Sequence, residues 1–198
     1  MFGAGLLHMT NELEAAQAAV DLGYSMSAGL VHLARALDIG LALTSYQSGL
    51  FYLIGRNPAS GGLNVHQTPV ARPMGLAPAA DGSLWLAAGL HIIRFVNVLD
   101  PDQRANQIFD ACYVPRTVHV TGDLDAHDLG IDAAGRPVFV NTRFNCLVRL
   151  SDRYSFEDVW RPPFISALVD EDRCHLHGMA LRDGAPGYVT AVSRSATI

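Results

Sequence analysis

The sequence is poor in charge and has no basic surface of the kind that binds nucleic acid. Charged residues make up 17% of its 198 residues, and the formal net charge is −5. Nucleic-acid-binding domains carry clustered basic residues, often with aromatic residues between them, and this chain has no such cluster. A nucleic-acid partner is therefore not expected.

Segments that would direct the chain into or across a membrane are also lacking. No apolar run reaches the roughly 18 residues that a membrane-spanning helix needs. The start, MFGAGLLH, has no basic stretch of the kind that opens a secretory signal. We therefore expect a cytoplasmic protein without a membrane partner.

Cysteine is scarce, and the common catalytic motifs are absent. The three cysteines, Cys112, Cys146 and Cys174, lie far apart, so they provide neither a disulfide framework nor a paired-cysteine zinc motif. We expect reduced and mostly buried thiols, Cys174 included. There is no GxGxxG, P-loop, nucleophile elbow or HExxH. Nucleotide chemistry is not expected.

What is present divides the chain into a short helical part and a long β part. Residues 11–20 (NELEAAQAAV) and 27–37 have the capping residues and apolar spacing of helices. We expect residues 1–40 to form an N-terminal helical cap. From residue 41 to residue 198 the pattern changes to short apolar strands separated by turns.

A strand–turn–strand unit recurs along the β part, and its turn glycines, Gly82, Gly135 and Gly184, fall about 50 residues apart. A first, shorter pair of strands is expected over residues 41–46 and 50–55, followed by units that begin near residues 73, 127 and 177. Small sheets that recur at this period pack radially in an all-β fold, the β-propeller. Unrelated hairpins in a β-sandwich are the alternative. Trp85, Phe139 and Tyr188 share a strand position and are expected in the core between blades.

About four blades are visible, and the last stops after its second strand. The ring is therefore expected to be incomplete in this chain, either because the chain is part of a longer ring or because another copy completes it. An open blade edge exposes unpaired backbone groups, so self-association is expected.

Four segments carry a resemblance to a known family: LALTSYQ (41–47), RPMGL (72–76), VNTRF (140–144) and EDRCHL (171–176). Over about residues 30–194 the chain resembles a bacterial family of conserved hypothetical proteins. The resemblance implies a propeller-like fold, joined in some members to tetratricopeptide repeats, and no established activity. It also implies a longer chain, and asparagine where this sequence has His177.

The densest polar stretch, EDRCHLHG (171–178), supplies the main functional candidates, because buried polar groups must pair, bind a ligand or hold a metal. The innermost strand of each blade starts at one mouth of the channel, which gathers Arg72–Met74, His127, Asp128 and His175–Gly178. Imidazoles gathered there can bind a divalent transition metal. His127, His175 and His177 are the candidate ligands, joined by His119 if its loop folds over the mouth.

Acids and arginines complete the candidate site. Asp128, Glu171 or Asp172 could complete the metal shell or orient a histidine ring. Arg143 and Arg173 could grip an anionic group, or could form structural ion pairs with neighbouring acids. Among these we single out Asp128, Glu171, Arg173 and Arg143 as candidate catalytic residues.

Three functions fit this pattern. The first is a metal-dependent enzyme that acts on a small molecule at the channel mouth. The second is a non-catalytic binding or scaffold propeller for a protein or an anionic ligand at the same mouth. The third is an architectural module whose polar loops lock blades together. The polar loops favour the first two, and the sequence does not separate these.

Overall fold

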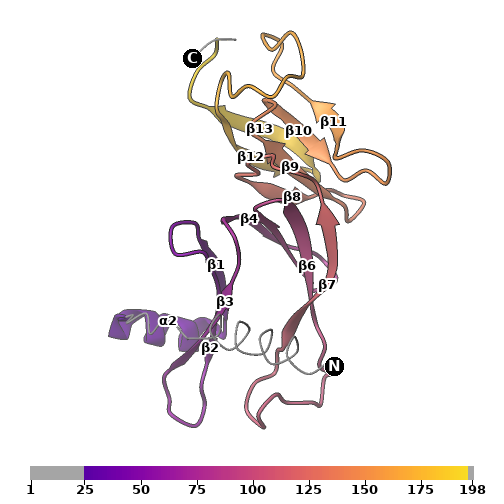
Figure 1. The fold of residues 1–198 in the computed structure, drawn as a ribbon. Coiled ribbons are helices and arrows are strands. Elements are labelled where there is room, and N and C mark those ends of the chain that lie inside the picture. The colour runs from indigo at the N-terminus through magenta and orange to yellow at the C-terminus, as the bar shows by residue number, and fades with distance from the viewer. Residues whose placement is uncertain (1–24, 196–198) are drawn as a thin grey trace, which may run out of the picture.

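The computed structural model describes residues 25–195 (Figure 1). They form one helix, α2 (Ala28–Leu37), followed by strands β1 to β13. The predicted helix over residues 11–20 lies outside the described residues, and the division of the chain at residue 40 stays a prediction. No helix within the described range is long and apolar enough to cross a membrane.

Helix α2 confirms the prediction over residues 27–37. The Ser27 hydroxyl accepts a hydrogen bond from the backbone N–H of Leu30, which caps the first turn. Asp38 ends the helix in the left-handed conformation and forms an ion pair with Arg56 at the end of β2. The helix therefore lies beside the first sheet (Figure 1).

Four antiparallel sheets follow one another along the chain, and in each the strands lie in sequence order. The first sheet contains β1 (Leu41–Ser45), β2 (Leu50–Arg56) and β3 (Leu63–Pro69). The second contains β4 (Pro73–Pro78), β5 (Leu84–Ala88), β6 (His91–Asn97) and β7 (Tyr113–Val120). The third contains β8 (Leu129–Ile131), β9 (Pro137–Asn141), β10 (Cys146–Arg149) and β11 (Glu157–Trp160). The fourth contains β12 (Leu176–Arg182) and β13 (Ala185–Ala191).

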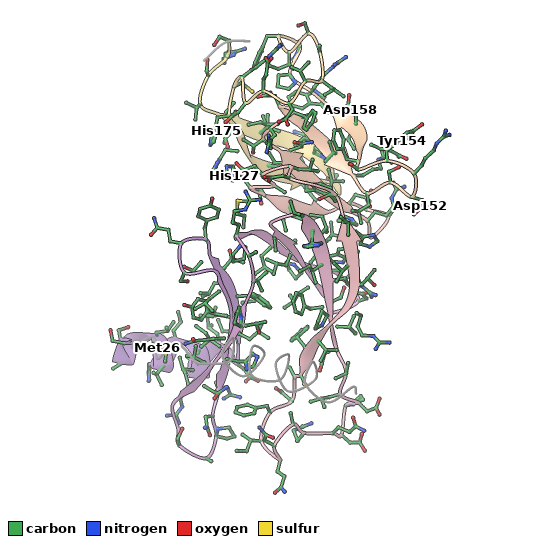
Figure 2. All side chains as sticks on the ribbon, in the orientation of Figure 1. Met26, His127, Asp152, Tyr154, Asp158 and His175 are labelled. Carbon is green, nitrogen blue, oxygen red and sulfur yellow. The ribbon has the colours of Figure 1, made fainter. Side chains whose placement is uncertain are left out.

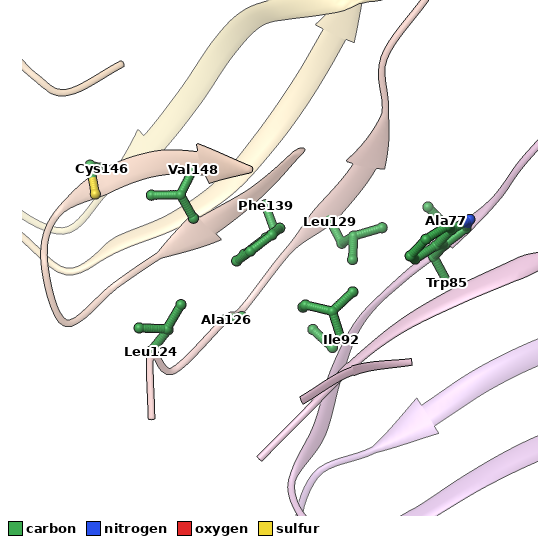
Figure 3. Packing of buried hydrophobic residues seen from close by; sticks show 10 residues of the cluster. Ala77, Trp85, Ile92, Leu124, Ala126, Leu129, Phe139, Cys146 and Val148 are labelled. Carbon is green, nitrogen blue, oxygen red and sulfur yellow. The ribbon is translucent and has the colours of Figure 1, made fainter. Parts of the chain in front are cut away.

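Three apolar clusters join each sheet face to face with the next. Phe51, Leu86 and Phe95 lie between the first and second sheets. A second cluster, which includes Trp85 and Phe139, lies between the second and third sheets (Figure 3). The third joins the third and fourth sheets, and contains Val138, Val140, Leu147, Ile165, Cys174 and Leu176. Successive antiparallel meanders packed in this way, of which the second and third have four strands, are the blades of a propeller. The predicted all-β, partly formed propeller with a short helical segment is therefore confirmed.

Strands β5 and β9 are buried on both faces. Trp85 and Phe139 point into the cluster between the second and third sheets, whereas their neighbours Leu86 and Val140 point into the clusters on the other sides. Alternate residues of a strand face opposite sides of a sheet, so both sides must be apolar. This explains why these strands are continuous apolar runs in the sequence.

Two expectations about the blades were wrong or incomplete. Tyr188 is 64% exposed, because among the described residues no further sheet packs against its side of β13. The outer strands β3, β7 and β11 were also missed, since each is half exposed and polar. Pro115 within β7 further weakens its strand pattern.

The cysteines are reduced and mostly buried, as expected from the sequence. Cys112, Cys146 and Cys174 are all free, and the last two are buried. Burial raises the pKa of the Cys146 thiol to about 12 and also raises that of Cys174. The raised pKa of each thiol disfavours the thiolate, which is the nucleophilic form.

Candidate metal site

Three histidines meet where the third and fourth sheets begin. His127 lies just before β8, His175 just before β12, and His177 within β12. The ring centroids are 4.5 Å apart for His127 and His177, 5.2 Å for His127 and His175, and 5.7 Å for His175 and His177. One ligand atom from each lies within 4.8 Å of the others, and Figure 2 shows His127 and His175 near each other on one side of the molecule.

The backbone turns in the same way before the first strands of the second, third and fourth sheets. Arg72, Asp125 and His175 have φ angles of 46°, 50° and 47°, in the left-handed region that residues other than glycine rarely adopt. Each lies two residues before Met74, His127 and His177, respectively. Strained conformations of this kind cost about 1–3 kcal/mol each and cluster at functional sites. This repeated turn brings Met74, His127 and His177 to the same mouth.

Asp172 orients the ring of His175. One carboxylate oxygen accepts a hydrogen bond from the backbone N–H of His175 at 2.9 Å, and the other lies 2.5 Å from ring Nδ1. A carboxylate on one ring nitrogen fixes the tautomer and leaves the other nitrogen as a lone-pair donor. His175 therefore presents Nε2 to a ligand.

His127 is the most enclosed of the three rings, with 15% of its side chain exposed. Its Nδ1 lies 3.0 Å from the sulfur of Met74. Its Nε2 lies 3.5 Å from a carboxylate oxygen of Asp125 and is buried without a hydrogen-bond partner. Burial lowers the pKa of His127, opposed in part by the charge of Asp125. A lowered pKa favours the neutral form of the ring, which is the form that binds metals.

A pocket of about 380 Å³ opens beside this cluster. Residues from all four sheets line it. They are Thr44 and Tyr46 at the end of β1, Pro73 and Met74 at the start of β4, His127 before β8 and His177 in β12. Sequence reasoning placed Met74 at the mouth but assigned it no role, and it missed Tyr46 and Thr44. The signal for Met74 was present, because it precedes the turn glycine of its unit by eight residues, as His127 does.

Each arginine at the mouth is paired with acids. Arg143 contacts Asp170 at 2.6 Å and Asp123 at 3.2 Å. Both acids raise the pKa of Arg143, and Asp170 has the larger effect. Arg72 bonds Asp123 at 2.9 Å, so Asp123 bridges the two guanidinium groups. Arg173 contacts Glu171 at 2.8 Å. From the sequence, Arg143 and Arg173 could either bind an anion or form structural ion pairs. In the structure, both form ion pairs with neighbouring acids.

Of the other candidates, Asp128 and Glu171 have partners away from the cluster. The Asp128 oxygens accept hydrogen bonds from the backbone N–H groups of Leu129 and Met179, each at 2.8 Å. Glu171 is an exposed partner of Arg173. The structure places Asp128 in a link between two sheets rather than beside the imidazoles.

The expectation for His119 needs correction. Residues 113–120 form the outer strand β7 instead of a loop over the mouth, because they pair with β6 along its whole length. The His119 ring stacks on Trp85, with 6.1 Å between centroids. It is therefore not brought to the other three histidines.

Comparisons with known proteins give a family and a distant structure. Residues 28–198 match the family described as "Domain of unknown function (DUF4915)". A search of curated proteins found no match. A solved structure of a luciferin-regenerating enzyme is 13% identical with a TM-score of 0.36, and the match covers 66% of this chain and 39% of that one. The chain thus spans well under half the length of that structure.

Proposed function

Since the chain belongs to the DUF4915 family, whose description assigns no function, we propose a function from its site. The protein is a metal-dependent enzyme that acts on a small molecule at the propeller mouth, and His127, His175 and His177 hold a transition-metal ion. The observation that carries this proposal is the convergence of three imidazole ligand atoms within 4.8 Å of one another.

The residues present fit a metal ion in their chemistry. Neutral imidazoles suit zinc, copper, iron and nickel. Asp172 supplies the outer carboxylate that orients a metal-binding histidine. A bound metal of this kind supplies a Lewis acid or an activated water.

The pocket gives the site a place for a substrate. Its volume of about 380 Å³ falls in the range of small-molecule sites. His127 and His177 form part of its wall, so a molecule in the pocket would contact the ligand set directly. Tyr46 and His177 line the pocket and carry polar groups that could orient that molecule.

The arrangement of charge favours an enzyme over a non-catalytic anion binder. An anion site at the mouth would need guanidinium groups free to accept it. Arg72, Arg143 and Arg173 instead each have a carboxylate within 3 Å. Binding of an anion would have to displace these acids.

The test is the metal content of protein purified without a histidine tag. Wild type is compared with His127→Ala and His175→Ala, and with His66→Ala, which removes an exposed histidine of β3. We expect near-stoichiometric metal in wild type and in His66→Ala, and loss from the other two variants with the circular dichroism spectrum unchanged. Wild type that stays metal-free after incubation with zinc, iron, copper and manganese would refute the proposal and favour the non-catalytic binding propeller.

A further inference from the structure

We propose that Met74 is a fourth ligand of this site and that the three histidines and the thioether together select copper(I) over zinc. This inference rests on the proposed metal site and specifies its ion. It is carried by the position of the Met74 sulfur and by the chemistry of the complete donor set.

Met74 occupies the same place in its blade as two of the histidines occupy in theirs. Met74, His127 and His177 each follow a left-handed residue by two positions, and each stands at the start of the innermost strand of its sheet. Propeller geometry brings equivalent positions of successive blades to one ring around the channel mouth. Met74 is the contribution of the second sheet to the ring that supplies His127 and His177.

The structure brings the Met74 sulfur into contact with the ligand set. Sδ lies 3.0 Å from Nδ1 of His127, and both side chains line the pocket with His177. Two donor atoms of one metal ion, each bonded at about 2.0–2.3 Å, lie about 3–3.7 Å apart at ordinary bond angles. The sulfur is therefore at the distance from Nδ1 of His127 that coordination of one ion by both atoms requires.

The backbone of Met74 is held in place from two sides. Its carbonyl oxygen accepts a hydrogen bond from the Thr44 hydroxyl at 2.8 Å, which ties it to the first sheet. The next residue, Gly75, lies so close to the backbone of Asp128 that a Cβ would come within 2.7 Å of it. Any larger residue there would push β4 away from His127. These contacts position the thioether more firmly than its flexible side chain alone would allow.

The donor set points to a soft monovalent ion. The three imidazoles and the thioether are all neutral ligands, and the soft sulfur of a thioether favours copper(I). Zinc sites more often include thiolate or carboxylate ligands. The acids near this cluster, Asp125 and Asp172, face ring nitrogens of His127 and His175 instead. A hydrogen bond from Nδ1–H of His127 to the Met74 sulfur, without any metal bond, is the alternative that the experiment must separate.

The experiment titrates tag-free protein with copper(I), without oxygen and against a chromophoric competing chelator, and separately with zinc against a competing dye. Met74→Leu keeps the volume and removes the sulfur. Met179→Leu makes the same change in β12, where Met179 packs against the apolar cluster between the third and fourth sheets. We expect Met74→Leu to weaken copper(I) binding about tenfold or more with little change for zinc, and Met179→Leu to leave both unchanged.

X-ray absorption on the copper-loaded wild type provides a second readout that needs no variant to fold. A copper–sulfur scattering shell, absent from Met74→Leu, is the expected result. Histidine-only scattering, or equal copper(I) affinity in wild type and Met74→Leu, overturns the role of Met74 and leaves the three-histidine site standing. Failure of wild type to bind either ion overturns the metal site itself.

Discussion

The carboxylate of Asp128 accepts a hydrogen bond from the backbone N–H of Met179, 51 residues later in the chain, at a distance of 2.8 Å. Its other oxygen accepts from the N–H of Leu129, so one side chain joins the first strands of the third and fourth sheets. His127 lies just before the first of these strands, and His177 lies near the start of the second. The link therefore fixes the spacing of two imidazoles as well as the packing of two blades.

Replacement of Asp128 by alanine should weaken both the packing of the third and fourth sheets and the positioning of His127 and His177. Hydrogen bonds to a charged group contribute about 1.5–3 kcal/mol, so we expect the free energy of unfolding to fall by about that amount in urea titrations. Zinc affinity should fall as well, because β12 is no longer held against β8. Asp152→Ala, which removes an exposed acid of the third sheet's outer loop, is the matched control. Equal stability of Asp128→Ala and wild type would show that the link contributes nothing.

Asp172 should matter for metal affinity and little for stability. It holds Nδ1 of His175 from an exposed turn, and loss of an outer carboxylate typically weakens metal binding about 10–100-fold. We expect that loss in Asp172→Ala by competition titration with zinc. The control is Glu171→Ala, because Glu171 is the neighbouring acid but pairs with Arg173. If the two variants bind zinc equally well, Asp172 does not orient the ring.

The innermost two strands of each blade, and the mouth they share, could be predicted from the sequence. Strands such as β9 are buried on both faces, so they must be apolar throughout, and the glycine turns beside them are strongly signalled. The repeat then places His127 and His177 at equivalent positions. Those features are set by local composition, which the sequence shows directly.

The features of the site that could not be predicted depend on contacts between segments far apart in the chain. His119 was expected near the mouth because nothing in its own sequence shows that residues 113–120 pair with β6. The bridge from Arg72 through Asp123 to Arg143 joins three connections whose conformations are fixed only in the folded protein. The left-handed turn at His175, which allows its ring to approach His177, likewise has no sequence signature.

The first turn of the second sheet should make stability depend on acid pH. The pKa of Asp81 is lowered to about 2, from an ordinary value of 3.8, by the hydrogen bonds that its carboxylate accepts. These come from the Ser83 hydroxyl, then the Ser83 backbone N–H, and then Arg94. A carboxyl whose pKa is lower in the folded state stabilises the fold above its unfolded pKa, and this contribution is lost as the pH falls. The loss should therefore occur between about pH 4 and pH 2.

Thermal unfolding of wild type and Asp81→Asn across this range provides the check. The variant should melt at a lower temperature than wild type at neutral pH, and the difference should shrink as the pH falls toward 2. Asp102→Asn, which alters an exposed acid of the loop between β6 and β7, should follow wild type throughout. A difference between Asp81→Asn and wild type that does not change with pH would contradict the assignment.

Two aromatic residues at matching strand positions should differ sharply in their contribution to stability. Phe139 of β9 is completely buried between the second and third sheets, whereas Tyr188 of β13 is 64% exposed. Removing a buried phenylalanine ring costs about 3–5 kcal/mol, because the cavity it leaves fills only in part. An exposed side chain usually changes stability by no more than about 0.5 kcal/mol. Urea unfolding of Phe139→Ala and Tyr188→Ala should show this contrast. A large loss of stability in Tyr188→Ala would mean instead that β13 is covered in solution, as expected if another sheet or a second copy packs against the open face of the last blade.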